Sequence, residues 1–131
     1  SEQKPEALGP TLPEIAELLV NVEPVSKSSF SCCGSQKFVS QLSGLDKKQV
    51  LLCGIEAHIC IYQTAVDLVG MGYEVTVAAD AVSSRTSENK QIALSAFRTS
   101  GVKISSVEMV LFELLRTADH PGFGEIVRLI K

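Results

Sequence analysis

The stretch VLLCGIEAHICIYQTAVDLV, residues 50–69, predicts a buried strand, a short loop and a helix, in that order. Residues 50–53 form an uninterrupted apolar run that ends at Gly54, a pattern typical of a strand that is buried on both faces. From Ile61 onward the apolar residues recur with the period of a helix that packs on a sheet. A strand that leads through a loop into a helix is the repeating unit of an α/β fold.

Cys60 lies at or beside the first turn of this predicted helix. The turn carries unpaired N–H groups and the positive end of the helix dipole. Cysteines in such positions can have pKa values of about 3.5 to 7.5 instead of about 8.5. The position therefore favours a nucleophilic thiolate, although a buried structural cysteine is the commoner role of this residue type. We expect Cys53 to lie in the core, whereas Cys32 and Cys33 could be packed or exposed.

Strands and helices alternate along the rest of the chain. We expect a loop over residues 1–10, strands over 22–26, 74–79 and 102–105, a loop over 80–85, and helices over 11–19, 35–44, 87–101, 107–115 and 121–130. This order implies right-handed crossovers and a parallel sheet. The predicted fold class is therefore α/β.

Lys27, the loop from Gly54 to Cys60, and residues 80–85 all follow predicted strands. Because the carboxyl ends of parallel strands share one edge of a sheet, these groups should lie near one another. A lysine near Cys60 would stabilise a thiolate by charge, and a solvated surface lysine is the alternative. Asp80 is more typical of a turn or a helix cap than of a base. His58 could pair with Cys60, but one residue separates them and their side chains need not meet.

The composition excludes several classes of protein. At 131 residues with 45% hydrophobic content, the chain is expected to fold as a single domain. The net charge of −3 and the lack of a Lys/Arg run argue against nucleic-acid binding. No apolar run approaches the roughly 20 residues that a membrane span needs. With 21% charged residues, apolar surface is left to cover, so we expect a homo-oligomer.

The four cysteines and two histidines do not form a recognisable framework. Two cysteines are adjacent and one lies mid-strand, which is unlike a disulfide scaffold, and no leader precedes the chain, so a reducing cytoplasmic location is predicted. His58 and His120 lack the spacing of metal ligands, and no dinucleotide or phosphate-binding glycine loop is present. We therefore expect neither a metal nor a cofactor, and a small molecule as the partner.

Several segments together resemble a known family. GIEAHIC at 54–60, QTA at 63–65, GYEV at 72–75 and DAVSSR at 80–85 resemble the isochorismatase-like cysteine hydrolases, a superfamily that includes the nicotinamidases. Residues 1–3 and 8–14 are similar to the isochorismatase domain-containing group. The resemblance runs from Ser1 to Lys131 and implies a doubly wound parallel sheet with helices on both faces.

The resemblance also implies roles for particular residues. Cys60 matches the family nucleophile and Lys27 the catalytic lysine. The oxyanion hole would use the backbone N–H groups of Glu56 and Cys60, with a cis peptide bond between Ile55 and Glu56. Ile55, Ala57 and His58 are the candidates for the loop that lines the pocket.

The family's third catalytic residue is an aspartate in the first strand, and this sequence begins after that strand. We therefore expect the single domain over 1–131 to be incomplete at its N-terminus, without its first βα unit. The retained cysteine favours hydrolysis of an amide, an ester or a related C–N or C–O bond through a covalent intermediate. The alternatives are a catalytically inactive binding or scaffold protein, and a redox sensor that uses Cys32, Cys33 or Cys60.

Overall fold

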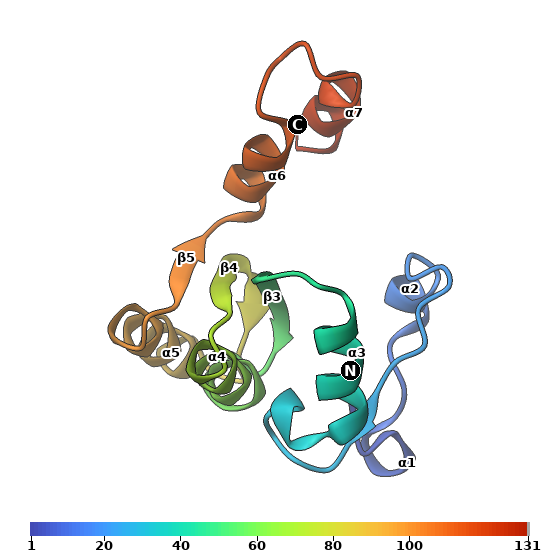
Figure 1. Ribbon diagram of the computed structural model, residues 1–131, viewed down its shortest axis with the longest axis vertical. Coiled ribbons are helices and arrows are strands. Elements are labelled where there is room, and N and C mark those ends of the chain that lie inside the picture. The colour runs from blue at the N-terminus through green and yellow to red at the C-terminus, as the bar shows by residue number, and fades with distance from the viewer. Residues whose placement is uncertain (131) are drawn as a thin grey trace.

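The computed structural model describes residues 1–130 and contains short parallel strands flanked by helices (Figure 1). The strands are β1 (Glu2–Gln3), β2 (Ser26–Lys27), β3 (Gln49–Ile55), β4 (Glu74–Ser83) and β5 (Lys103–Ser105). The α-helices are α1 (Pro5–Leu8), α2 (Pro13–Ala16), α3 (Gln36–Gly44), α4 (Tyr62–Gly70), α5 (Ser87–Thr99), α6 (Val107–Leu115) and α7 (Phe123–Leu129). A short 3-10 helix, η1 (Cys32–Gly34), precedes α3, and a π-helical turn, η2 (Ala57–Ile61), precedes α4.

The strands form two separate parallel sheets. One sheet pairs β1 with β2, and the other has the order β3-β4-β5, so β3 and β5 are its edges. Figure 1 shows α1, α2 and α3 on the same side of the molecule as β1 and β2, and α4 and α5 side by side against the larger sheet. Parallel strands joined through helices are what the order of elements in the sequence predicts. The α/β fold class is confirmed.

The core lies between the larger sheet and the helices α4 and α5. Alternate residues of β4, Val75 and Val77, point to this side, and Leu68 of α4 and Phe97 of α5 pack against them. All four are at most 1% exposed, and the ring of Phe97 lies 5.8 Å from that of Tyr62. α6 lies across the opposite face, so helices cover both sides of this sheet.

The prediction that β3 is buried on both faces is wrong. Val50 and Leu52 are half-buried and pack against the core, but Leu51 is 49% exposed and Ile55 is 73% exposed. Cys53, which we expected in the core, is exposed as well. The reason is that β3 is an edge strand, and α4 and α5 cover only one of its faces. An apolar run cannot show which of its faces will be covered.

Several element boundaries differ from those predicted. The expected loop over 1–10 contains β1 and α1. The strand expected over 22–26 lies at Ser26–Lys27 instead, where it pairs with the two residues of β1. Helix α2 ends at Ala16, where Leu18 and Leu19 bond carbonyls three residues back. The expected loop over 80–85 is strand as far as Ser83, because β4 pairs with the end of β3.

The predicted helices over 35–44, 87–101 and 107–115 are confirmed within a few residues. Ser35 and Ser106 cap α3 and α6 by accepting hydrogen bonds from Phe38 and Met109. Gly101 has a φ of +77° after α5, as expected of a glycine that ends a helix. α7 begins at Phe123, two residues after Pro121.

Gly54 should tolerate no side chain, because its φ of +118° lies in a region that L-residues rarely adopt. We expect Gly54→Ala to lower the free energy of unfolding by about 1–3 kcal/mol. Gly70→Ala is the matched control, since a Cβ at this helical glycine meets no atom within 4 Å. We expect the control to leave stability equal or slightly higher. Urea unfolding of both variants measures the difference, and equal stabilities would contradict this account of the turn.

Candidate functional site

Cys60 lies in the π-helical turn η2, between strand β3 and helix α4. The peptide bond between Ile55 and Glu56 is cis, as the family resemblance implies. The carbonyl of Glu56 accepts hydrogen bonds from the N–H groups of Ile59 at 3.1 Å and Ile61 at 3.2 Å, which winds the chain around Cys60. Cys60 is half-buried. The predicted strand, loop and helix are present, but a π-turn rather than an α-helical first turn carries the thiol.

Lys27 ends strand β2 and is only 8% exposed. Its Nζ donates to Oε1 of Gln3 at 2.6 Å, to the carbonyl of Ser29 at 3.0 Å and to the carbonyl of Phe30 at 2.8 Å. All three acceptors are neutral oxygens. None of the ion pairs among residues 1–130 includes Lys27. The alternative of a solvated surface lysine is therefore wrong.

Lys27 and Cys60 line the same hollow, which has a volume of about 660 Å³. Its wall consists of β1, the segment around α1 and α2, the exposed side of β3, and the turn η2. The lining residues include Gln3, Leu12, Lys27, Cys32, Phe38, Cys53, Ile55 and Cys60. The structure thus brings together two residues that are 33 positions apart: Lys27 ends a strand of the smaller sheet, and Cys60 lies in the turn that follows a strand of the larger one.

The other residues of the predicted loop have different surroundings. Ile55 lies on the wall of the hollow, but Ala57 is fully buried in the core. His58 does not contact Cys60 through a hydrogen bond; its Nδ1 shares one with Oγ of Ser84 at 3.0 Å. Asp80 accepts from the backbone N–H of Val107 at 2.8 Å and so acts as a helix cap, as its position in the sequence predicts.

The side chain of Glu56 is held by Arg85. Its carboxylate accepts from the backbone N–H of Arg85 at 2.9 Å, from Nε at 3.1 Å and from Nη2 at 2.7 Å. These hydrogen bonds, together with the charge of Arg85 and of the nearby His58, lower the pKa of the Glu56 carboxyl to about 2. This pair was not predicted from the sequence, because the family resemblance gives a role only to the backbone of Glu56.

Two polar residues of α4 hold the segment that follows Lys27. Oγ1 of Thr64, which is 2% exposed, accepts from the backbone N–H of Cys32 at 2.9 Å. Asp67, three residues further on, accepts from Oγ of Ser31 at 2.5 Å. Thr64 lies one helical turn after Cys60, so this contact ties the Lys27 segment to the helix that follows the thiol. Hydroxyl and carboxylate groups spaced by three in an apolar helix were the signal in the sequence for this contact.

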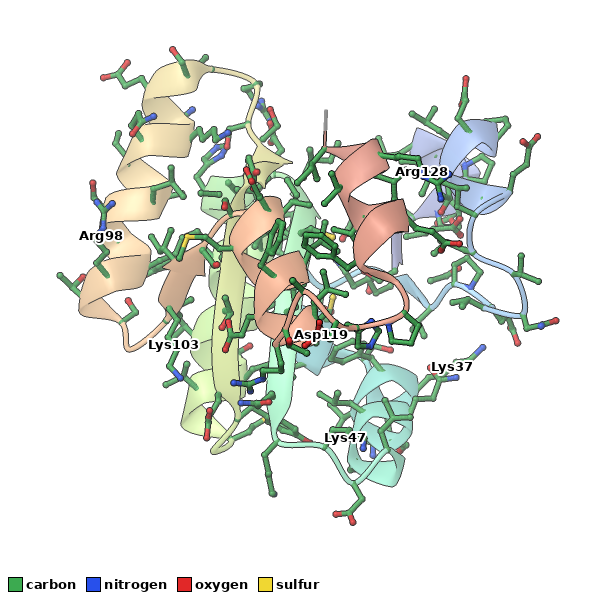
Figure 2. The ribbon with its side chains drawn as sticks, turned by 90° about the horizontal axis from the view of Figure 1, so that it is seen from above. Lys37, Lys47, Arg98, Lys103, Asp119 and Arg128 are labelled. Atoms are coloured by element: carbon green, nitrogen blue, oxygen red, sulfur yellow. The ribbon has the colours of Figure 1, made fainter. Side chains whose placement is uncertain are left out.

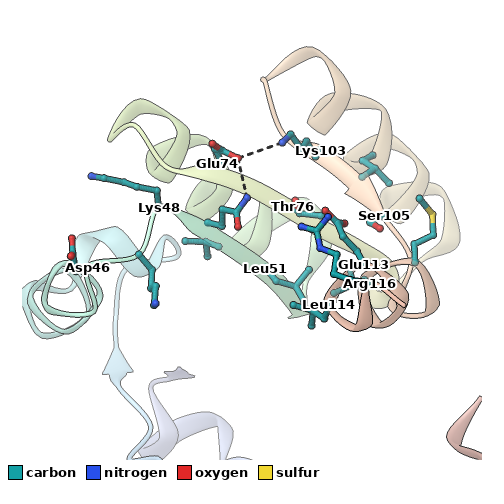
Figure 3. Close-up of a pocket in the computed structure, with 16 residues that line it drawn as sticks. Asp46, Lys48, Leu51, Glu74, Thr76, Lys103, Ser105, Glu113, Leu114 and Arg116 are labelled. Carbon is teal, nitrogen blue, oxygen red and sulfur yellow. Dashed lines mark hydrogen bonds and ion pairs between the residues drawn. The ribbon is translucent and has the colours of Figure 1, made fainter. Parts of the chain in front are cut away.

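A second and larger hollow, of about 820 Å³, lies between α6 and the face of the larger sheet that α4 and α5 leave open, and Leu51 lines both hollows (Figure 3). Figure 3 shows the ion pair between Glu74 and Lys103, whose Oε2 and Nζ lie 3.5 Å apart. The same oxygen of Glu74 accepts from Nε2 of Gln49 at 3.3 Å. Leu51, Thr76 and residues of α6 form the rest of its wall. Its floor thus includes an ion pair that already neutralises two charges, and no cysteine or histidine lines it. The hollow that contains Cys60 and Lys27 is therefore the candidate functional site.

No group of three or more His, Cys, Asp or Glu side chains among residues 1–130 is arranged to hold a metal ion. Within the same residues, no helix is long and apolar enough to cross a membrane.

The fold and the site define a parallel α/β protein with a cysteine in the turn that follows an edge strand. The sequence matches the isochorismatase domain over residues 3–109, and the chain belongs to the isochorismatase family. It is 45% identical over 130 residues to isochorismatase domain-containing protein 2 of Danio rerio, a match that covers 99% of this chain and 65% of the relative. The chain therefore spans slightly less than two thirds of that relative's length.

Two further relatives extend this comparison. The structure of the MAR1 ribonuclease from Caenorhabditis elegans superposes with a TM-score of 0.89 at 36% identity, covering 98% of this chain and 66% of that one. A secreted isochorismatase effector of Phytophthora sojae is 52% identical over 85 residues, which cover 65% of this chain and 40% of the effector. Because one relative is secreted, the cytoplasmic location of this chain stays a prediction. The single domain over 1–131 and the homo-oligomer also stay predictions.

The Glu56–Arg85 pair makes one region of the molecule sensitive to acid. Because the pKa of Glu56 is about 2 instead of its ordinary 4.5, the pair contributes stability in full above about pH 4.5, and this is lost as the pH falls through about 2. We expect Arg85→Gln to raise the pKa of Glu56 toward its ordinary value. NMR titration of the Glu56 carboxyl measures this, with Arg98→Ala as the control. An unchanged pKa in Arg85→Gln would contradict the assignment.

Thr64→Val should weaken the contact between α4 and the Lys27 segment. Valine has nearly the shape of threonine but leaves the N–H of Cys32 without its acceptor, so we expect a loss of about 1–3 kcal/mol in the free energy of unfolding. Thr64→Ser keeps the hydroxyl and should be less destabilised. Thermal unfolding compares the two variants, and a Thr64→Val protein as stable as the wild type would show that the hydrogen bond contributes little.

Proposed function

We propose that this chain forms part of a small-molecule hydrolase in which Cys60 is the nucleophile and Lys27 stabilises negative charge in the hollow. The observation that carries this proposal is the buried ammonium of Lys27, which shares the hollow with Cys60 and has only neutral hydrogen-bond partners. The family supports hydrolysis in general, and the cysteine mechanism is our inference from the residues.

Burial of the Lys27 ammonium costs free energy. A buried ammonium is strongly disfavoured unless it is hydrogen-bonded and near a counter-charge. The oxygens of Gln3, Ser29 and Phe30 satisfy the hydrogen bonds of Lys27 but leave its positive charge uncompensated. An anion in the hollow, either the thiolate of Cys60 or the oxyanion of an intermediate, would compensate it. Lys27 therefore suits a reaction that develops negative charge at this place.

In the proposed reaction, Sγ of Cys60 attacks the carbonyl carbon of an amide or ester and a C–S bond forms. The carbonyl oxygen becomes an oxyanion, which the backbone N–H groups of Glu56 and Cys60 and the charge of Lys27 stabilise. The C–N or C–O bond then breaks, and the leaving amine or alcohol takes a proton from a general acid. Water then attacks the resulting thioester and gives a proton back to the general acid. The C–S bond breaks, which releases the carboxylic acid and restores the thiolate of Cys60.

The general acid is not evident among residues 1–130. Glu2 is the carboxylate on the wall of the hollow, but its Oε1 accepts from the N–H of Thr11 at 2.7 Å and from Oγ1 of Thr11 at 2.8 Å. These hydrogen bonds lower the pKa of Glu2, which makes it a poor proton donor. We therefore propose that the acid is the aspartate that the family resemblance implies, supplied from outside residues 1–130.

The substrate class follows from the wall of the hollow. Among the described lining residues Lys27 is the one cationic side chain, and most of the others are apolar. The net charge of the chain is −3. A polyanion such as RNA needs several cations along its path, so we favour a small uncharged or singly charged substrate, although the Caenorhabditis elegans relative is described as a ribonuclease. A binding protein without turnover is the alternative.

Alkylation of the full-length protein tests the role of Lys27. Iodoacetamide should modify Cys60 faster than Cys32, Cys33 or Cys53, as measured by mass spectrometry of the labelled peptides. We expect Lys27→Met to slow the labelling of Cys60 by about tenfold, the effect of roughly 1.4 kcal/mol of lost charge interaction. Lys37→Met is the matched control, because Lys37 points outward in Figure 2 and pairs only with Glu23 at 2.9 Å. Equal labelling of all accessible cysteines would reject an activated nucleophile.

A measurement of turnover distinguishes the proposed enzyme from the alternative, a binding protein. A panel of small amides and esters, with an RNA oligonucleotide beside them, should contain a substrate that the full-length protein hydrolyses. Cys60→Ser should then reduce kcat by more than about 10³-fold. Ligand binding without turnover across the panel would favour the alternative, and cleavage of the RNA alone would overturn the substrate class.

A further inference from the structure

We propose that Ser84 and Arg85, the two residues that follow strand β4, are positioning residues for the turn that carries Cys60. Each of them binds one side chain of the segment between β3 and Cys60: Arg85 holds Glu56 and Ser84 holds His58. We call these four residues the β4 clamp. The holding role stands on the contacts alone, and its effect on catalysis rests on the function proposed above.

The side-chain contacts of the β4 clamp begin where the backbone pairing between β3 and β4 ends. The backbone pairing between β3 and β4 ends at Ile55 opposite Ser83. One residue beyond Ile55 and two residues beyond Ser83, the carboxylate of Glu56 meets the guanidinium of Arg85 in a fork, with Nε at 3.1 Å and Nη2 at 2.7 Å. The backbone N–H of Arg85 adds a third bond to the same carboxylate at 2.9 Å. Such paired, charged hydrogen bonds fix orientation as well as distance.

The second contact of the β4 clamp involves His58, two residues after Glu56. Nδ1 of His58 and Oγ of Ser84 lie 3.0 Å apart. Between Glu56 and His58 stands Ala57, which is fully buried in the core. Residues 56, 57 and 58 are thus all held in place. Glu56 and His58 make polar contacts on the outside, and Ala57 packs in the core.

The part of the β4 clamp that comes from β4 is connected to a well-packed helix. Arg85 is followed directly by Thr86, whose side chain caps α5 by accepting from the N–H of Asn89 at 3.2 Å. α5 is anchored in the core by Phe97, which is fully buried. The guanidinium of Arg85 is therefore attached, within a few residues, to both the central strand and a packed helix.

Glu56 is the residue through which the clamp would act on the thiol. Its carbonyl accepts the N–H groups of Ile59 and Ile61 and so starts the π-turn around Cys60. A rotation of Glu56 would consequently move the turn and the backbone N–H groups that point from it. Arg85 does not line the hollow and its side chain is 69% exposed, so it would not touch a substrate itself.

Because Arg85 is exposed, its effect on the position of the turn can be separated from its effect on the stability of the protein. Ion pairs at the surface contribute little to the free energy of unfolding, because water and salt screen them and ordered side chains lose entropy. If Arg85 acted only on stability, its substitution would therefore change the melting temperature and the reactivity of Cys60 very little. A residue that fixes the turn should change the reactivity of Cys60 while the melting temperature changes little.

A double-mutant cycle on the full-length protein tests the proposal, with Arg85→Ala, Glu56→Gln and their combination. The readouts are the rate at which iodoacetamide labels Cys60, hydrogen exchange of the backbone amides of residues 56–61, and Tm. We expect Arg85→Ala to accelerate this exchange and to slow labelling by about tenfold, since displacing a reacting group by about 1 Å can change rates by up to about 10²-fold. The double variant should be no worse than either single variant, because both remove the same contact.

Two further variants sharpen the test. Arg85→Lys keeps the charge but not the fork and should give intermediate values, while Ser84→Ala should affect the same amides more weakly. Arg98→Ala is the matched control, because Arg98 points away from the body of the protein on α5 (Figure 2) and should leave all three readouts unchanged.

The proposal is overturned if Arg85→Ala leaves both exchange and labelling unchanged, if the two single effects add, or if the slower labelling merely follows a lower Tm. Failure of the proposed function looks different. In that case wild-type Cys60 is labelled no faster than exposed Cys53, while hydrogen exchange at residues 56–61 still decides whether the clamp holds the turn.

Discussion

The hydrogen bond from the backbone of Cys32 to the buried hydroxyl of Thr64 is the contact on which the site depends. The two sheets share no strand pairing, so the part of the chain that bears Lys27 must reach the part that bears Cys60 by another route. Helix α4 provides it, with Thr64 and Asp67 binding the two residues Cys32 and Ser31. Because Thr64 follows Cys60 by one helical turn, the docking of this segment also sets where Lys27 lies relative to the thiol.

The turn around Cys60 is constrained from two sides. On the inner side, Ala57 and the apolar face of α4 belong to the core that also contains Phe97. On the outer side, Glu56 and His58 are bound by the residues that follow β4. A reactive group gains from such constraint, because the cost of ordering it is met during folding rather than during the reaction. The edge position of β3 leaves the third side open, and this side is the hollow.

Charge distinguishes the two hollows described above. The larger one is lined by exposed side chains of both signs, with Glu74 paired to Lys103: Asp46, Glu74, Glu113, Lys47, Lys48, Lys103 and Arg116. In the hollow that contains Cys60, Lys27 has only neutral oxygens around its ammonium. Uncompensated charge in a partly buried place is a feature of sites that stabilise ions, whether in a bound ligand or in an intermediate. This difference, more than the volume of either hollow, supports the proposed place of the reaction.

The sequence by itself determined the α/β class, most of the helices, and the strand, turn and helix around Cys60. These features depend on local pattern and on the resemblance of short segments, which also implied the cis bond before Glu56. Only the tertiary structure decided that β3 is an edge with Cys53 exposed, that Lys27 is buried, and that Arg85 binds Glu56. The contacts of Lys27 with Gln3 and of Arg85 with Glu56 join residues at least 24 positions apart. Cys53 is exposed because no segment covers it, and burial depends on what packs alongside a residue. A pattern in the chain shows which residues are apolar or charged, but the distances between separate segments are set by how the layers pack.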